Sequence, residues 1–112
     1  MICSIKTLGI SGIQGNLITA ECFISNGLPG FAIVGLPDAA VKEARERVRA
    51  AAKSSGLAFP VSRITVNLAP ANVKKEGSAL DLALFCALMQ AGGVIKRDVD
   101  LSDKCFIGEL SF

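Results

Sequence analysis

The side chains that could do chemistry in this sequence are few, because its 112 residues include no histidine. Without histidine there is no Ser-His-Asp or Cys-His nucleophile and no imidazole ligand for a metal. Neither GxxxxGK(S/T) nor GxGxxG occurs, so the sequence has no standard phosphate-binding loop. What remains is a Ser-Lys arrangement, a carboxylate site or no chemistry. We predict no catalytic, cofactor-binding or metal-ligating residue in this chain.

Basic side chains gather on one predicted helix and in one loop. Three of them follow at four-residue spacing, which places them on one helix face, and a fourth lies one turn earlier. The chain carries 12 basic and 10 acidic residues, so its composition alone does not indicate a nucleic-acid-binding protein. The candidates for contacts with DNA phosphates or a neighbouring subunit are Lys42, Arg45, Arg49, Lys53, Lys74 and Lys75. The ordinary alternative is a solvated helix face.

Strands are expected in the first third of the chain from alternation and turn residues. Residues 2–9 and 16–25 partly alternate apolar and polar side chains, and the turn residues of 12–15 favour a β-hairpin. After the Asn26-Gly27 turn, residues 31–34 are wholly apolar. That short run predicts a strand buried on both faces.

Two helices are expected, each with a start and a stop signal. The first opens at Pro37-Asp38, where Asp38 can cap the first turn, and ends near residues 54–56. The second begins at Ser78, as its cap, and runs to about residue 91, before Gly92-Gly93. The apolar stripe of the first helix, at spacings of three and four, consists of Val41, Ala44, Val48 and Ala51.

Two more strands complete the pattern, at residues 63–69 and about 104–110. In the first, Ile64, Val66 and Leu68 alternate with polar residues, which indicates one covered face. The order is then β-β-β-α-β-α-β. With 51% hydrophobic residues, the chain can bury a core. The fold class that fits is a two-layer α/β (α+β) domain over residues 1–112, with one mixed sheet and two helices.

The four cysteines, Cys3, Cys22, Cys86 and Cys105, form no CxxC pair, and each lies in an apolar stretch. Buried, reduced thiols in a cytoplasmic protein are the expectation, with no signal peptide at the first residues. The apolar run 79–91 is interrupted by Asp81 and Gln90 and is too short to cross a bilayer, so no membrane partner is predicted.

Three segments carry a family resemblance that extends over essentially the whole chain. They are SNGLPGFAIVGLPDAAVKEARERVRAA (25–51), RITVNLAPANVKKEGSALDLAL (63–84) and FIGELSF (106–112). Together they resemble the N-terminal domain of Mg-chelatase-subunit-I-like AAA+ ATPases, the YifB/ComM family. In that family the chain continues past GELS into another strand and then into the ATPase module. The resemblance therefore implies that this chain presents an unprotected sheet edge or is covered there by a partner.

The family domain is similar in fold to the Lon proteolytic domain and to a ribosomal-protein-type fold. This implies a left-handed β-α-β crossover, against the right-handed rule. Lon-type proteases place their serine just after a Lys-Asp-Gly turn, which corresponds here to Lys75-Glu76-Gly77. Aligned on that glycine, the nucleophile position falls on Ala79, and the dyad lysine would lie beyond Phe112. The resemblance thus argues against proteolysis by these residues.

Seven residues of the family-like segments are expected to have structural roles first: Gly35, Pro37, Asp38, Asn67, Gly77, Ser78 and Asp81. Gly35 would permit a positive φ or a close strand approach. Asp81 suits the positive end of a helix, with a metal or partner contact as the alternative. Asn67 would bond neighbouring backbone, and a functional role for it stays open.

The function that the resemblance implies is that of a non-catalytic accessory domain. Its parent would be a DNA-binding hexameric motor that promotes branch migration in natural transformation. ATP and Mg would belong to the ATPase module outside this chain, and the partners would be that module, neighbouring subunits and DNA. The alternatives are a degenerate Lon-type Ser-Lys hydrolase, which would need a reactive Ser78, and a stand-alone RNA-binding domain, which would need a concentrated basic surface.

Overall fold

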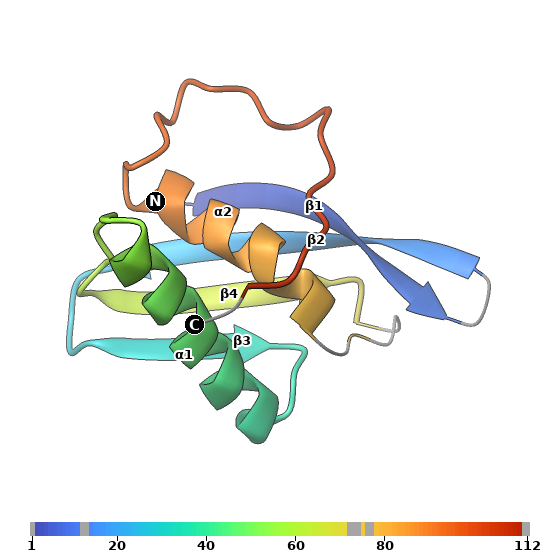
Figure 1. Cartoon of the computed structure of the whole chain (residues 1–112), viewed down its shortest axis with the longest axis horizontal. Coiled ribbons are helices and arrows are strands. Elements are labelled where there is room, and N and C mark those ends of the chain that lie inside the picture. Colours follow the sequence, from blue (N-terminus) through green and yellow to red (C-terminus); the bar gives the residue numbers. More distant parts are fainter. Residues whose placement is uncertain (1, 12–13, 72–74, 76–77, 111–112) are drawn as a thin grey trace.

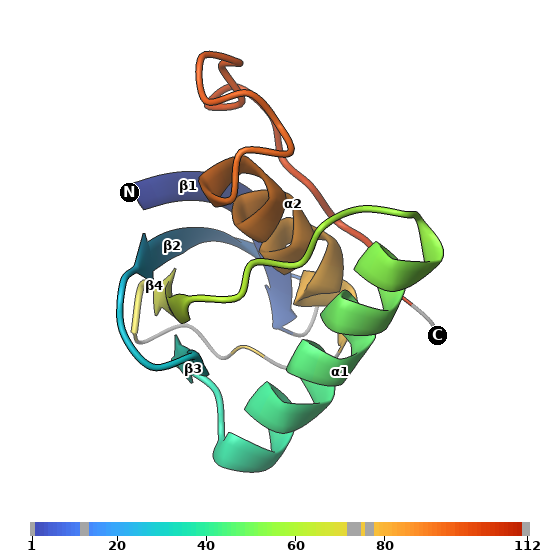
Figure 2. The same ribbon diagram turned by 90° about the vertical axis from the view of Figure 1, so that its left-hand side faces the viewer.

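Four strands and two helices form a two-layer structure in this computed structural model, which describes residues 2–11, 14–71, 75 and 78–110. Both helices lie on the same side of one sheet (Figures 1 and 2). The elements are β1 (Ile2–Ser11), β2 (Gln14–Ser25), β3 (Gly30–Val34), α1 (Asp38–Ser54), β4 (Arg63–Ala69), the 3-10 turn η1 (Ser78–Leu80) and α2 (Asp81–Ala91). The mixed sheet with two helices is thereby confirmed.

The sheet has the strand order β1-β2-β4-β3. β1 pairs antiparallel with β2, and β2 pairs antiparallel with β4, with Glu21 directly opposite Asn67. β3 runs parallel to β4, so α1 connects two parallel neighbours. The predicted hairpin over the first two strands is confirmed. The left-handed crossover and the likeness to the Lon domain stay predictions.

One face of the sheet is buried under the helices, as the alternation in β4 predicted. Ile64, Val66 and Leu68 are buried, whereas the residues between them are only half-buried. α2 packs over this face and is buried along most of its length, including Leu84 and Leu88. Because α2 is apolar nearly all round, it lies at the centre of the core rather than on its surface.

The prediction that the strand at 31–34 is buried on both faces is wrong. In β3 only Ile33 is buried, and Val34 is 58% exposed. The reason is that both helices lie on one side of the sheet, so every second side chain of β3 faces the uncovered side; β3 also pairs with β4 alone, at an edge of the sheet (Figure 2). An apolar run of four residues cannot distinguish an edge strand from a central one.

The predicted last strand at 104–110 is also wrong. The segment makes one parallel bridge to β1, between Lys6 and Cys105, where the amide of Phe106 donates to the carbonyl oxygen of Lys6 at 2.9 Å. It then turns to the start of α2. There the amide of Leu82 donates to the carbonyl oxygen of Gly108 at 3.2 Å. The backbone groups of the segment thus satisfy the first turn of α2 instead of extending the sheet.

The helix ends agree with the sequence in part. α1 ends at Ser54 and α2 at Ala91, each followed by a glycine with positive φ, Gly56 at 69° and Gly93 at 85°. Asp38, however, is not the cap of α1. Pro37 occupies the N-cap position with extended backbone, and Asp38 is the first helical residue, at the positive end of the helix.

Two smaller expectations about the helices change. The buried stripe of α1 consists of Ala44, Val48 and Ala52, so Ala52 takes the place expected for Ala51. Ser78 opens the 3-10 turn η1, and α2 itself begins at Asp81 with Leu80 as its N-cap residue. Among the described residues, no helix is long and apolar enough to cross a membrane.

Candidate functional site on helix α1

Four basic residues of α1 lie along one side of the helix, where the sequence placed them. Lys42, Arg49 and Lys53 are exposed, and the side chain of Arg45 is 34% exposed. The buried stripe of α1 faces the core, so these four cations lie beside it at the surface. We call Lys42, Arg45, Arg49 and Lys53 the basic ridge.

Glu46 reduces the positive charge of the ridge at its centre. Its Oε1 lies 3.6 Å from Nη2 of Arg45 and 3.9 Å from Nη1 of Arg49. All three side chains are at least one-third exposed, so these ion pairs contribute little to stability and are screened by salt. A ligand with a stronger negative charge can therefore replace Glu46 at either arginine at small cost.

A groove lies beside the ridge, between α1 and the ends of β3 and β4. Its volume is about 400 Å³. Arg45 and Arg49 form one wall, and no acidic side chain of the described residues lines it. The remaining lining is mostly apolar and includes Pro29, Phe31, Phe59, Pro60, Val61 and Ile64. A second hollow of about 300 Å³ continues along α1, with Phe31, Arg45, Lys42 and Asp38 in its wall.

Two aromatic rings make the floor of this groove. Phe31 from β3 and Phe59 from the α1–β4 connection are stacked with ring centroids 6.4 Å apart. The guanidinium carbon of Arg49 lies 5.4 Å from the centroid of the Phe59 ring, in cation–π geometry. The position of Arg49 is thus fixed by a ring as well as by Glu46. The sequence reading missed the groove, because three separate segments build it.

Of the two loop lysines, the structure describes Lys75, and Lys75 does not join the ridge. Lys75 is only 9% exposed, and its Nζ donates a hydrogen bond to the carbonyl oxygen of Pro70. The prediction that Lys75 offers a surface charge to DNA or a subunit is therefore corrected, because a buried and hydrogen-bonded ammonium is not available to a ligand. Lys74 lies outside the described residues, as does Gly77.

Arg47 has a different role from its neighbours on α1. It turns toward α2, where its Nε donates to Oδ2 of Asp81 at 2.5 Å and its Nη2 donates to Oδ1 at 3.1 Å. Asp81 is 1% exposed. This hydrogen bond and, after it, the nearby carboxylates raise the pKa of Arg47, although burial acts against them. Asp81, expected at a helix end, is therefore also the buried partner of an arginine on the other helix.

Two other motif residues have identifiable contacts. Asn67 bonds a side chain rather than backbone: its Nδ2 donates to Oε1 of Glu21 at 3.2 Å, across the β2–β4 pair. Gly35 has a φ of 113°, and a Cβ there would lie 3.2 Å from the Cβ of Leu68. The glycine is needed both for its backbone conformation and for this close approach, as the sequence indicated.

Ser78 lies in the wall of a separate hollow between the helices. This hollow has a volume of about 270 Å³ and is shared with Glu43, Arg47 and Asp81. No lysine of the described residues lines it. The arrangement gives Ser78 no amine that could act as a base, so the described residues do not support the Ser-Lys alternative.

The cysteines are free thiols in different surroundings. Cys22 and Cys86 are buried, Cys3 is half-buried, and Cys105 is exposed, contrary to the expectation for it. Burial raises the pKa of Cys22 to about 12, with a smaller contribution from Cys3, which is its register partner on β1. In the part of the chain that the structure describes, no three cysteine or carboxylate side chains gather as metal ligands would.

The sequence has relatives among known proteins over nearly its whole length. Residues 20–112 match the family of subunit ChlI of Mg-chelatase. YifB of Salmonella typhimurium is 51% identical over 107 residues, which are 96% of this chain and 21% of that protein. The competence protein ComM of Haemophilus influenzae is 49% identical over 100 residues, or 89% of this chain and 19% of ComM. The chain thus spans about a fifth of the length of these relatives.

Proposed function

Because this chain belongs to the family of subunit ChlI of Mg-chelatase, we propose that it acts as a non-catalytic accessory domain of a longer AAA+ ATPase. The observation that carries the proposal is the extent of the similarity. YifB and ComM match almost all of this chain, yet the match covers only about a fifth of their own length. In this proposal, nucleotide binding and hydrolysis, with ATP and Mg, belong to the remaining four-fifths.

The parent protein, in the same proposal, is a cytoplasmic DNA-binding motor that promotes branch migration in natural transformation. The similarity to ComM, a competence protein, supports natural transformation as the setting. The basic ridge supports a contact with DNA or a subunit, because Lys42, Arg49 and Lys53 are exposed on one helix and Arg45 is half-exposed. Such a ridge can face the phosphates of DNA or the surface of a neighbouring subunit. No observation favours a hydrolase or an RNA-binding domain over this reading.

A salt titration of DNA binding by the full-length protein tests the proposal. The variant is Arg45→Glu/Arg49→Glu/Lys53→Glu, and a single exposed change away from α1, Lys104→Glu, is the control. If the ridge neutralises phosphates, the log–log salt slope should flatten by about 0.9 per lost duplex contact. If the ridge meets a subunit, the oligomer should dissociate first, and DNA affinity should fall with it.

Two results would refute the proposal. The first is a triple variant that keeps its salt slope, DNA affinity and oligomeric size, which would make the ridge a solvated face. The second is a full-length protein without DNA-stimulated ATP hydrolysis, which would show that the parent protein is not a DNA-dependent motor.

A further inference from the structure

The groove beside α1 has a composition that selects its occupant. Its floor is apolar and aromatic, and the two guanidinium groups on one wall stand on successive turns of α1. An occupant should therefore offer one apolar side chain together with two carboxylates. A nucleic-acid base fits less well, because the Phe59 ring already has Phe31 stacked with it and Arg49 over it.

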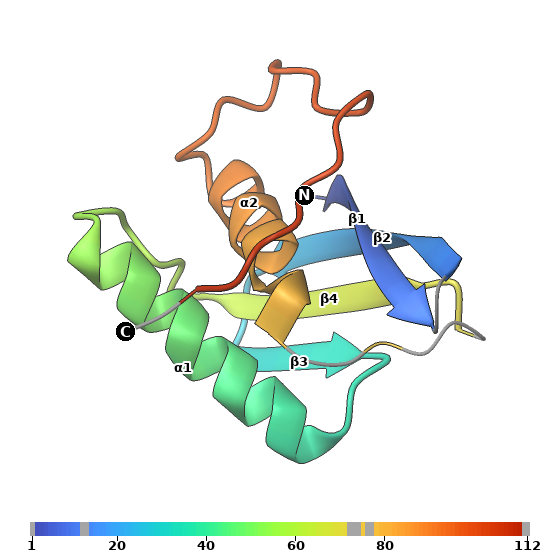
Figure 3. The same cartoon turned by 45° about the vertical axis from the view of Figure 1, so that its right-hand side comes forward.

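A loop of this same chain carries the complementary pattern. The connection between α2 and the bridge at Cys105 projects from the body on the side of α2 away from α1 and β3 (Figures 1 and 3). Residues 98–100 of this connection, here called the loop tip, read Asp98-Val99-Asp100, and Val99 is 43% exposed. Asp98 has no side-chain hydrogen bond or ion pair to any described residue, and Asp100 accepts hydrogen bonds from Ser102 alone, one of them from its amide at 2.9 Å. The loop tip thus presents an apolar side chain between two exposed carboxylates.

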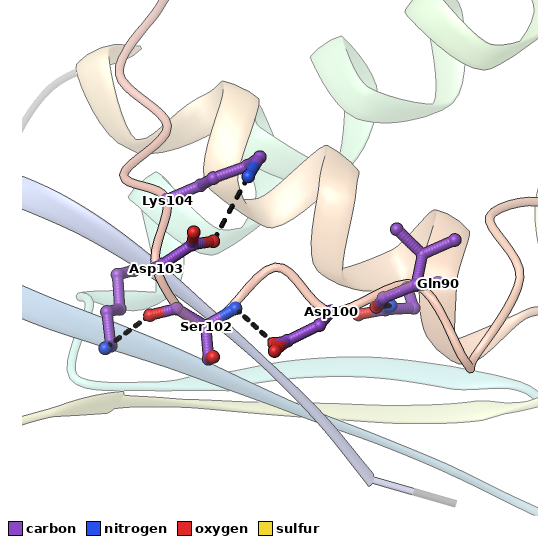
Figure 4. A network of polar contacts seen from close by, with 7 residues as sticks. Gln90, Asp100, Ser102, Asp103 and Lys104 are labelled. Carbon is purple, nitrogen blue, oxygen red and sulfur yellow. Dashed lines mark hydrogen bonds and ion pairs between the residues drawn. The ribbon is translucent and has the colours of Figure 1, made fainter.

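The loop is held in place by side chains from the body of the protein. Nε2 of Gln90, a residue only 6% exposed, donates to the carbonyl oxygens of Val99 at 2.9 Å and of Lys96 at 3.4 Å. Figure 4 shows Gln90 and, in the same loop, the hydrogen bond between Asp100 and Ser102. Nζ of Lys6 donates to the carbonyl oxygen of Ser102 at 2.6 Å. These bonds fix the backbone on both sides of the tip. Because the loop is ordered beforehand, docking it costs little conformational entropy.

We propose that the loop tip of one copy of this chain docks in the Arg45–Arg49 groove of the next copy. The spacings are compatible, because side chains four apart on a helix stand about 5–6 Å apart and residues two apart in a chain at most about 7 Å. The carboxylates of Asp98 and Asp100 then meet the two arginines in place of Glu46, and Val99 meets the aromatic floor. Loop and groove lie near opposite edges of the sheet, β1 and β3.

The contact is heterologous, since it joins two different surfaces of identical chains. Repetition of such a contact leads to a ring where the rotation closes and to a filament where it does not. This contact rests on the function proposed above, and it specifies which surfaces of neighbouring subunits would meet. The DNA titration and the association test below use different proteins and readouts, so the failure of one is distinguishable from the failure of the other.

The test is the self-association of this chain by sedimentation, with folding checked by circular dichroism. Concentrations from about 10 µM to about 1 mM cover weak contacts of this size. We expect concentration-dependent association that weakens at least about tenfold in Arg45→Glu/Arg49→Glu and, separately, in Asp98→Lys/Asp100→Lys. The controls Ser54→Glu, on the same helix outside both the groove and the basic ridge, and Asp103→Lys, in the same loop beside the tip, should associate like the wild type.

Mixing the two double variants decides whether loop and groove meet each other. The groove variant keeps an intact loop and the loop variant keeps an intact groove, so the mixture should form a 1:1 complex that grows no further. Three results would overturn the proposal: a wild-type chain that stays monomeric throughout, association that only one of the two double variants weakens, or folded variants that form no mixed complex.

Discussion

Arg47 and Arg49 are two residues apart on one helix, yet the structure uses them in opposite ways. Arg47 points to α2 and makes two hydrogen bonds to Asp81, which is 1% exposed. The side chain of Arg49 is 52% exposed and has only a 3.9 Å ion pair with Glu46 and a ring beneath it. Two positions along a helix rotate a side chain by about 200°, which takes it from the core side to the solvent side.

The difference teaches that residue type and local spacing do not show which cation supports the fold. A buried carboxylate that loses its partner leaves an uncompensated charge in a poorly hydrated place. An exposed ion pair that loses a partner leaves a charge in water. The inner side of α1 should therefore be sensitive to substitution, while its outer side stays free to bind another molecule.

The largest expected effect is that of Arg47→Ala. Removing the guanidinium leaves the Asp81 carboxylate buried and unpaired, which should lower the free energy of unfolding by about 3 kcal/mol. Arg49→Ala, the matched control on the outer side, should cost about 0.5 kcal/mol or less. Urea unfolding of both variants measures the difference, provided that the m-values agree. Equal losses in the two variants would break the comparison.

Alkaline pH should reveal a second buried group of the inner layer. The pKa of Cys22 is about 12 in the folded chain against an ordinary 9.0, because burial disfavours the thiolate. The unfolded chain therefore loses its proton first, so stability is complete below about pH 9 and falls as the pH rises toward 12. We expect a loss of about 3 kcal/mol from this group by about pH 11.

Cys22→Ala is the variant that isolates this loss. It should flatten the alkaline part of the stability curve, and Arg47→Ala should not, since its effect is already present at neutral pH. Cys105→Ala, at an exposed thiol, is the control and should follow the wild type. A curve that Cys22→Ala leaves unchanged would assign the alkaline loss to other groups.

On the outer side of α1, the aromatic floor should matter more than the charges. Phe59 is half-buried, stacks on Phe31 and packs against the core cluster. Phe59→Ala should cost about 1–2 kcal/mol, less than truncation of a fully buried phenylalanine. Phe59→Leu, which keeps apolar volume but no ring, should recover much of the stability and none of the cation–π contact with Arg49. Thermal unfolding of the two variants distinguishes packing from the cation–π contribution.

The sequence predicted the elements whose signals are local. Alternation at Ile64, Val66 and Leu68 predicted the covered face of β4, and Gly56 and Gly93 marked the ends of the helices. The basic ridge followed from helical spacing in the same way. In each case, the determining interaction lies within one element or at its end.

What the sequence could not predict depends on partners far apart in the chain. Arg47 and Asp81 are separated by 34 positions, and each has an ordinary local explanation, as an i,i+4 pair and as a helix-end acid. The segment at 104–110 is short and largely apolar, as a strand can be, but its backbone groups satisfy the start of α2. The groove needs the strand order as well, because β3 and the α1–β4 connection meet beside α1 only when β3 is an edge strand.

The smallest expected effect distinguishes the two glutamates of α1. Glu43 lies 3.8 Å from Arg47 and is 72% exposed, while Glu46 is shared between Arg45 and Arg49. Glu43→Gln and Glu46→Gln should each cost about 0.2–0.5 kcal/mol at low salt and almost nothing at high salt. Asp81 holds Arg47 with or without Glu43, so the stability of the inner side should barely change. Glu46→Gln should instead strengthen whatever the groove binds, because Glu46 is the acidic competitor that, among the described residues, contacts both arginines. Self-association measured beside urea unfolding separates the two outcomes. A Glu43→Gln loss above about 1 kcal/mol would mean that Glu43, and not Asp81 alone, anchors Arg47.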